Sequence, residues 1–337
     1  MKLSFVGCVL TLAVAVLACD EEPQVAPADT SAGAEAEIAP DADPEVVEPD
    51  VVAPETTDGL LAPPAQGFQI KSPPITVPAA TEETYCYYFT VPGDAAVGVK
   101  RWQSQMTAGS HHLIVYFTAE AEAPDGTITT GCDGFGGGGL SNVPVWTYSA
   151  QLREAEMVMP PGVGMQVAAQ QHGYVQMHYL NPTLEPLDVQ VAVNAETFDP
   201  GTTYTKASAF VTYHTEIAIP GGVGQTATAE GSCRVKPGLS FFSLSTHAHR
   251  RAVATEVKDG DAVIFASDDW EHPGVKRWPD GYTFGDTLKY RCDYKNDSAA
   301  AVGTGPSADT DEMCMAVGYF YPAERPIFCI NTFVVSQ

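Results

Sequence analysis

The sequence has few basic residues. Its 337 residues include 17 Lys and Arg against 42 Asp and Glu, a formal net charge of −25. The acids are unevenly placed, because 13 of them and no Lys or Arg lie between Asp20 and Gly67. The other 29 acids face the 16 bases that remain after Lys2. This excess of negative charge argues against nucleic acid as a partner, and we expect none.

Three further absences narrow the class of protein. No segment of helix length carries apolar residues at a sustained 3.6-residue period, so a helical fold is not expected. The six cysteines beyond the acidic segment form no C-x-x-C pair, which argues against a zinc ribbon or a thioredoxin motif. The glycine-rich run 134–139 lacks the Lys-Ser/Thr of a phosphate loop and is interpreted as a mobile surface loop.

The N-terminus is typical of an exported lipoprotein. A basic Lys2 and an apolar run predict a signal peptide over residues 1–18, which is too short to span a membrane. The ending Val16-Leu17-Ala18-Cys19 resembles the bacterial lipobox and predicts lipid on Cys19; the alternative is an ordinary signal peptide with a chance cysteine. Residues 19–67 would be a disordered acidic, Pro-rich linker. We expect an exported protein, periplasmic or at the cell surface, that meets the membrane through its lipid anchor only.

The rest of the chain predicts an all-β fold. Short runs rich in Val, Thr, Tyr and Phe alternate with Gly/Pro turns, which favours two consecutive antiparallel β-sandwiches of jelly-roll type. A break at Asp199-Pro200-Gly201 divides an N-terminal sandwich, residues 68–199, from a C-terminal one, residues 200–337. The runs expected to form strands are 84–91, 112–118, 173–179, 189–193, 210–219, 239–244 and 316–321.

Two histidines follow one of these strands. Residues 245–251 read Ser-Thr-His-Ala-His-Arg-Arg. Because residues i and i+2 of a strand face the same side, His247 and His249 would lie side by side, as two imidazole ligands of one metal ion do. The alternative is two unrelated histidines on a half-exposed strand.

Other candidate ligands are weak evidence when taken alone. His111-His112 open a strand, where neighbours face opposite sides, so both reach one ion only if the backbone bends there. His178, within the strand 173–179, could equally be a core histidine. Met313 could be ordinary packing or a soft thioether ligand, which favours Cu(I). His172, in a turn-like Gln-Gln-His-Gly, looks incidental.

Taken in order, these motifs resemble the copper type II, ascorbate-dependent monooxygenases, the family of peptidylglycine alpha-hydroxylating and dopamine beta-monooxygenases. The family order is His-His, a His in a Gln-x-His-Tyr strand, His-x-His, and a Met-Cys pair. This chain has His111-His112, Gln176-Met177-His178-Tyr179, His247-Ala248-His249 and Asp311-Glu312-Met313-Cys314. The resemblance covers about residues 68–333.

The resemblance implies an enzyme with two coppers per chain, and we expect a monomer. The first ligand set, for an electron-transfer copper, would be His111, His112 and His178. The second set, for the catalytic copper that binds oxygen, would be His247, His249 and Met313. The two sites would face each other across a solvent-filled cleft. With O2 and a one-electron donor such as ascorbate, the enzyme would hydroxylate a C–H bond of a small organic substrate.

Two other functions remain open at this stage. The chain could be an exported lipoprotein that binds or sequesters copper without catalysis. It could also be a surface adhesion module made of two sandwiches, for which a copper content near zero is expected.

The cysteines are consistent with export. Six cysteines in an exported chain imply disulfides, although sequence alone allows 15 connectivities. The family pattern implies the pairs Cys86–Cys132, Cys233–Cys329 and Cys292–Cys314. The last of these would hold Met313 next to a cross-link.

The sequence departs from the peptide hydroxylase at its substrate site. That enzyme has an Arg two residues before the first histidine of His-x-His, where this chain has Ser245. Its Asn and Tyr after the Met-Cys pair correspond to Met315 and Val317. An apolar wall without a fixed cation predicts a neutral or amine-bearing substrate rather than a peptide ending in glycine. Arg250 and Arg251 are the cations that could replace the missing Arg.

Overall fold

The computed structural model describes residues 59–132 and 144–336, and the account that follows concerns these residues. The expected signal peptide, the lipidation site Cys19, the linker as far as residue 58 and the glycine-rich run 134–139 lie outside them. Within the described ranges the chain forms 24 strands and no helix, which confirms the all-β prediction. It follows that none of these residues belongs to a helix that could cross a membrane.

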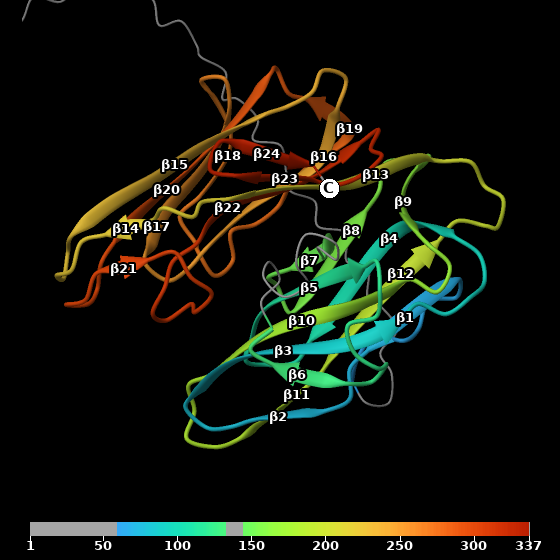
Figure 1. Ribbon diagram of the computed structural model, residues 1–337, viewed down its shortest axis with the longest axis horizontal. Helices are drawn as coiled ribbons and strands as arrows, with labels where there is room; N and C mark the ends of the chain where they lie inside the picture. The colour runs from blue at the N-terminus through green and yellow to red at the C-terminus, as the bar shows by residue number, and fades with distance from the viewer. Residues whose placement is uncertain (1–58, 133–143, 337) are drawn as a thin grey trace, which may run out of the picture. The chain divides into compact units, whose positions relative to one another are not determined.

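The first half of the described chain forms two facing sheets and a small strand pair (Figure 1). The strands of the first sheet are β3 (Thr81–Thr90), β5 (Ser110–Thr118), β6 (Ile128–Thr130), β7 (Val145–Ala150) and β10 (His172–Asn181). Those of the second are β1 (Gly67–Lys71), β4 (Val97–Met106), β8 (Glu154–Val158), β9 (Val163–Val167) and β12 (Val191–Thr197). The separate pair is β2 (Ile75–Val77) with β11 (Leu187–Val189). The first sheet runs β6-β3-β10-β5-β7, so β10 is its central strand.

The second half repeats this two-layer plan. The strands of its four-stranded sheet are, in order across the sheet, β15 (Thr226–Arg234), β20 (Thr287–Lys295), β17 (Ala252–Asp259) and β18 (Ala262–Ser267). The facing strands are β13 (Thr205–Tyr213), β16 (Ser240–Ala248), β19 (Lys276–Thr283), β22 (Cys314–Tyr321), β23 (Ile327–Ile330) and β24 (Phe333–Ser336). A further pair is β14 (Ala218–Ile219) with β21 (Val302–Gly303).

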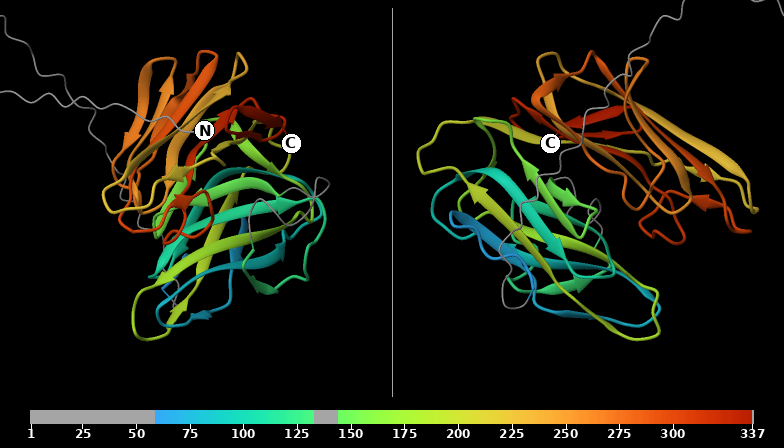
Figure 2. Two further views of the ribbon diagram at one scale, coloured as in Figure 1. Left: turned by 60° about the vertical axis from the view of Figure 1, so that its left-hand side comes forward. Right: turned by 180° about the vertical axis from the view of Figure 1, so that it is seen from behind.

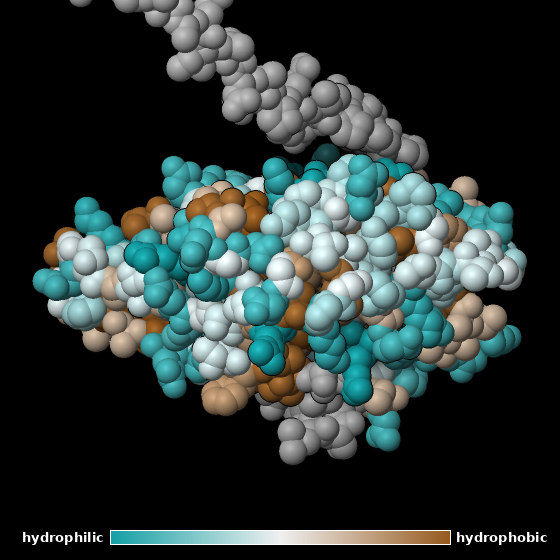
Figure 3. Space-filling view, turned by 90° about the horizontal axis from the view of Figure 1, so that it is seen from above, coloured by the Kyte–Doolittle hydropathy of each residue, from teal (hydrophilic) through white to brown (hydrophobic). Residues whose placement is uncertain are grey.

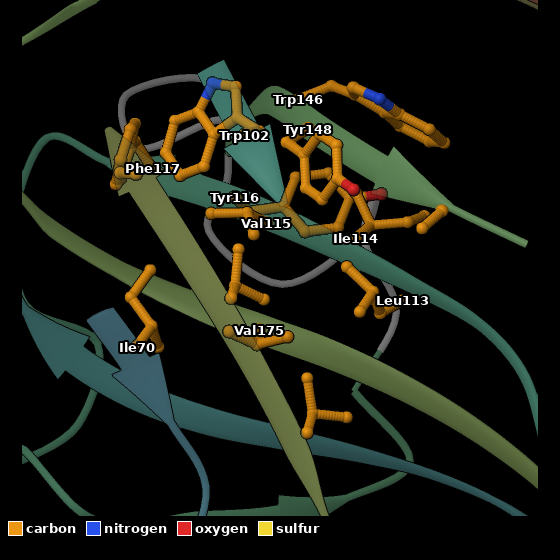
Figure 4. Close-up of a cluster of buried hydrophobic side chains, with 14 of the residues drawn as sticks. Ile70, Trp102, Leu113, Ile114, Val115, Tyr116, Phe117, Trp146, Tyr148 and Val175 are labelled. Carbon is orange, nitrogen blue, oxygen red and sulfur yellow. The ribbon is translucent and has the colours of Figure 1, made fainter. Parts of the chain in front are cut away.

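The described chain has two large apolar cores, and the first includes residues of both halves. In the first, the rings of Trp102 on β4 and Tyr148 on β7 come from opposite sheets and stack with centroids 5.7 Å apart (Figure 4). In the second, Leu288 and Tyr290 on β20 are buried at alternate positions, as one face of a half-covered strand requires. Each fully buried side chain of this size stabilises the fold by roughly 1.5–3 kcal/mol. On the face in Figure 3, hydrophilic residues surround smaller groups of apolar ones.

Strand β13 belongs to both sandwiches. Its first residues, Thr205–Ala207, pair in parallel with β9, and Ser208–Val211 pair antiparallel with β22. One sheet therefore runs β1-β12-β4-β9-β13-β22-β16-β19 through the two halves (Figure 2). The break at residues 199–201 is a turn just before β13, in which Thr202 N–H donates to the Asp199 carbonyl at 3.1 Å.

The folded chain begins earlier than the linker prediction of 19–67 allows. Leu60 and Leu61 are only 3% and 8% exposed and pack with Ala192. The Leu61 carbonyl also accepts a hydrogen bond from Gln69 at 2.8 Å. The composition of the segment does not predict this, because two leucines in an acidic, Pro-rich stretch do not form a strand pattern. In the structure they cover apolar surface beside β12.

The three disulfides are those that the resemblance implies. Cys86–Cys132, Cys233–Cys329 and Cys292–Cys314 are all formed. Each closes a loop within one half, and the model-dependent chain-entropy argument assigns such cross-links roughly 2–4 kcal/mol of stabilisation. The pair Cys292–Cys314 joins β20 to the start of β22, directly after Met313.

Candidate metal centre

A β-bulge places two neighbouring histidines on one side of the first half. In the pairing of β10 with β5, His178 lies opposite His112 and Tyr179 lies opposite Ser110, so His111 is the extra residue. A bulge sets two residues of one strand against one of its partner and redirects a side chain. This is the bend that both histidines need in order to reach one ion.

The bulge brings three ring nitrogens together. His111 Nδ1 lies 3.1 Å from His112 Nδ1 and 3.2 Å from His178 Nδ1. A single proton on His111 Nδ1 could be donated in only one of these two contacts. A metal ion held tetrahedrally by histidine nitrogens at about 2.0–2.1 Å would place those nitrogens about 3.3 Å apart. The three histidines therefore fit a metal ion, and they form a potential ligand group in the described chain.

Glu82 fixes the orientation of His178. The Glu82 carboxylate accepts a hydrogen bond from His178 Nε2 at 2.8 Å, which leaves the Nδ1 lone pair of His178 facing the other two rings. A carboxylate on the far nitrogen of a ligand histidine is the usual outer-shell arrangement at metal sites. Burial raises the pKa of Glu82, but hydrogen bonds from His178 and from the second half outweigh it and lower that pKa to about 2.

His247 and His249 lie side by side, as the strand period predicts. His247 is near the end of β16 and His249 follows it; their ring centroids are 5.4 Å apart, and the residues are 7% and 0% exposed. Their Nδ1 atoms are engaged, His247 with Gln151 Oε1 at 2.8 Å and His249 with the Asp311 carbonyl at 3.2 Å. Both Nδ1 atoms thus carry the proton, and Nε2 is the free ligand atom. His249 Nε2 is buried without a hydrogen-bond partner among the described residues.

Met313 is held opposite His249. Strands β16 and β22 pair as far as Ala248 with Cys314, so His249 and Met313 occupy the next position of that register. The Met313 carbonyl accepts a hydrogen bond from the Tyr294 hydroxyl at 2.8 Å. Its side chain is half-buried, and its thioether is a soft donor that, combined with imidazoles, suits Cu(I).

Glu312 ties the segment that carries Met313 to the segment that carries His247 and His249. Its carboxylate is fully buried and accepts the backbone N–H groups of His249 at 3.0 Å and Arg251 at 2.7 Å. Burial raises its pKa to about 7, although these hydrogen bonds oppose the shift. Since Glu312 directly precedes Met313, it fixes the position of Met313 relative to His249.

The residues of the two candidate ligand sets adjoin one another, which corrects the expectation of a solvent-filled cleft between them. The ring centroid of His247 lies 5.2 Å from that of His112 and 5.6 Å from that of His111. The ring centroid of His111 also lies 6.1 Å from that of His249. The physical reason is that one face of β22 is apolar. Its Met315 packs into the core cluster of the first half, which places β22 against the first half.

Burial favours the neutral form of four of these histidines. It lowers the pKa of His111 to about 3 and that of His249 to about 4, and it also lowers the pKa values of His112 and His247. The charges of neighbouring histidines act mainly in the same direction. A neutral imidazole has a free lone pair at neutral pH, so the cluster is ready to bind a metal ion without losing protons.

One further ring contacts the cluster. Trp270, in the loop between β18 and β19, has its ring centroid 5.5 Å from that of His111. Asp269 accepts the backbone N–H groups of Glu271 and His272 at 3.0 and 2.8 Å, which shapes the turn that carries Trp270. This aromatic side chain comes from the second half and lies against a first-half histidine.

Several of these residues were not found from the sequence. Glu82 and Gln151 act from 96 residues away on His178 and His247, and no local pattern indicates such a contact. Trp270 sits in a loop without a motif. His172 is elsewhere, as predicted, since its Nδ1 contacts Thr90 Oγ1 at 2.9 Å near the other end of β10.

The residues expected around a substrate are already engaged or buried. The Ser245 hydroxyl donates to the Gly274 carbonyl at 2.6 Å. Met315 and Val317 are 2% and 8% exposed. Of the two candidate cations, Arg251 is buried and pairs with Asp297 at 3.0 Å. The other, Arg250, pairs with Asp297 at 2.7 Å and with Asp309 at 3.1 Å.

Comparison with known proteins supports one family for the second half. Residues 206–335 match the family described as "Copper type II ascorbate-dependent monooxygenase, C-terminal domain". No curated protein matches the chain. Among solved structures, the major capsid protein P2 of bacteriophage PM2 is 11% identical, with a TM-score of 0.26 over 74% of this chain and 97% of the capsid protein.

Proposed function

We propose that the chain is a copper-dependent hydroxylase, because residues 206–335 match the C-terminal domain of the copper type II ascorbate-dependent monooxygenases. It would act on a C–H bond of a small organic molecule, with O2 and a one-electron donor such as ascorbate. The observation that carries the proposal is the convergence of His111, His112 and His178 at one point beside His247 and His249.

The chain's own residues prepare both ligand sets. In the first, Nδ1 atoms converge; in the second, Gln151 and the Asp311 carbonyl hold the Nδ1 protons and leave Nε2 for a metal ion. Burial favours the neutral form of His111, His112, His247 and His249 and limits water around them. Bound copper would supply one-electron redox chemistry and, at the His247/His249/Met313 set, the position for oxygen.

The proposed substrate is neutral or amine-bearing. A substrate carboxylate is best held by a free guanidinium, since charge-assisted bidentate hydrogen bonds contribute roughly 1.5–3 kcal/mol. The guanidinium groups that follow His249 are neutralised by Asp297 and Asp309 instead. Ser245 stands where the peptide hydroxylase has its Arg, and its hydroxyl donates a hydrogen bond to the Gly274 carbonyl. Trp270 adds an aromatic surface beside His111.

Metal analysis with oxygen uptake tests the proposal. The purified chain, reconstituted with copper, is expected to hold two coppers and to consume O2 when ascorbate and a panel of small amines and neutral aromatic compounds are supplied. A copper content near zero would contradict it and favour the adhesion function. Efficient hydroxylation of a glycine-extended peptide, lost on Ser245→Ala, would contradict the substrate class alone.

Copper sequestration is the second candidate, because the packing of the site is compatible with it. The histidine rings of the two sets lie 5–6 Å apart and His249 is fully buried, a geometry that suits holding metal as well as presenting it to a substrate. Two coppers per chain with no oxygen uptake or product in ascorbate would identify this function.

We also propose that the protein is exported and held at a membrane surface by lipid on Cys19. The support is the lipobox-like ending of the apolar run and the acidic segment after it. Mass spectrometry of the N-terminal peptide is expected to find acyl chains on Cys19. A Cys19→Ser protein that still partitions with membranes would contradict the anchor.

A further inference from the structure

Two first-half side chains touch the ligand sets and the second half at the same time. Glu82, on β3, contacts His178 through Oε1. The same oxygen accepts the backbone N–H of Ala308 at 2.7 Å, and Oε2 accepts the Ser307 hydroxyl at 2.9 Å. Gln151, just after β7, accepts from His247 and donates through Nε2 to the Thr246 carbonyl at 3.0 Å.

The Ser307–Ala308 segment belongs to a closed loop that positions the second ligand set. In this loop, residues 304–312, the Asp311 N–H donates to the Ser307 carbonyl at 3.0 Å and the Ser307 N–H donates to the Asp311 carboxylate at 3.2 Å. The loop ends in the Asp311 carbonyl that accepts from His249, and then in Glu312. Glu82 therefore holds a ligand of the first set directly and the support of a second-set ligand through the loop.

We propose, on the basis of the proposed function, that Glu82 and Gln151 are positioning residues for the two sets, and that Glu82 couples copper binding between them. Each fixes which ring nitrogen of a ligand histidine faces the metal position, and each requires the two halves to be docked. A copper ion that orders His178 orders Glu82 and the 304–312 loop with it. Binding in the first set thus raises affinity in the second, and reciprocity requires the reverse.

The test measures Cu(I) and Cu(II) affinity of the full chain by competition with chelators of known affinity, one ligand set at a time. Electron paramagnetic resonance of the Cu(II) form distinguishes the sets. Glu82→Ala is expected to weaken the first set about 10–100-fold, the cost typical of losing an outer-shell partner, and to weaken the second set as well. Gln151→Ala is expected to weaken the second set by a similar factor.

Two variants separate positioning from general docking. Arg277→Ala removes a contact between the halves, from the Arg277 guanidinium to the Glu156 carbonyl at 3.3 Å, that touches no histidine. It is expected to leave both affinities within about twofold of the wild type. Glu82→Gln keeps the acceptor for His178 and Ala308, and it is expected to restore most of the affinity that Glu82→Ala loses.

Each result decides something. Wild-type affinity at both sets in Glu82→Ala and Gln151→Ala would overturn the inference, as would an equal loss in Arg277→Ala. If Glu82→Ala fails to fold, Glu82→Gln and Gln151→Ala still provide the comparison with Arg277→Ala. A wild-type chain that takes up no copper would refute the proposed function instead. In that case, comparing the radius of gyration of Glu82→Ala with that of Arg277→Ala tests the contact of Glu82 with Ser307 and Ala308 by itself.

Discussion

Gln151 and His247 are 96 positions apart in the chain, yet Gln151 Oε1 lies 2.8 Å from His247 Nδ1. The two residues belong to different sandwiches, so a histidine of the second half receives its orientation from the first. The proposed ligand set His247, His249 and Met313 therefore depends on a residue of the other half, Gln151, for the orientation of His247.

The first ligand set is expected to depend on His178 and not on His172. Both histidines lie on β10, but only His178 has its Nδ1 within 3.2 Å of His111. His178→Ala should therefore reduce copper from two equivalents to one, and His172→Ala should retain two. Elemental analysis after dialysis measures this. Loss of copper on His172→Ala would show that the ligands are wrongly assigned.

Met313→Leu is expected to lower Cu(I) affinity at the second set while the first set stays loaded. Leucine keeps the volume and removes the thioether, so stability should change little. The loss should be at least the roughly 10–100-fold that an outer-shell change costs. Competition with a Cu(I) chelator measures it, and Met165→Leu, a buried core methionine on β9, is the matched control. Equal affinity of the Met313 and Met165 variants would remove Met313 from the site.

The metal-free protein is expected to lose stability as the pH falls below about 6.5. The pKa of His111 is about 3 and that of His249 about 4 in the folded state, so the unfolded chain binds more protons in this range. Each such histidine costs on the order of 1.4 kcal/mol per pH unit until its folded pKa is reached. Glu312, with its pKa raised to about 7, opposes this, but the pKa values of four histidines are lowered.

Urea unfolding in the presence of a chelator at pH 7.5 and pH 5.5 measures the effect. The free energy of unfolding should be several kcal/mol smaller at pH 5.5 by this argument. A value that is equal or larger at pH 5.5 would mean that the histidines are solvated in the metal-free protein. His172→Ala serves as a control, because it lies outside the cluster and should leave the pH dependence unchanged.

Copper is expected to quench the fluorescence of Trp270. Its ring lies 5.5 Å from that of His111, well within the range of quenching by a bound Cu(II) ion. Trp270→Phe should remove most of the copper-dependent change. Trp278→Phe, which alters a tryptophan stacked on Tyr282, should retain it. If quenching survives Trp270→Phe unchanged, the loop that carries Trp270 does not lie over the site.

The fold was predictable because its strands have local signatures. Runs such as 173–179 and 316–321 lie within β10 and β22, and the i, i+2 rule placed His247 beside His249 correctly. From the sequence, the bend at His111 could be stated only as a condition for metal binding by both histidines, because it depends on how β5 pairs with β10. Glu82 and Gln151 could not be found, because their contacts span 96 or more residues and follow from the docking of whole sheets.

The sharing of β13 has a consequence for any attempt to divide the protein. Its first three paired residues complete the edge beside β9, and the following ones complete the edge beside β22. A cut before residue 205 would leave β9 with a row of unsatisfied N–H and C=O groups, and a cut after residue 213 would do the same to β22 and β23. Such bare edges recruit strands from other molecules, so an isolated half is expected to aggregate.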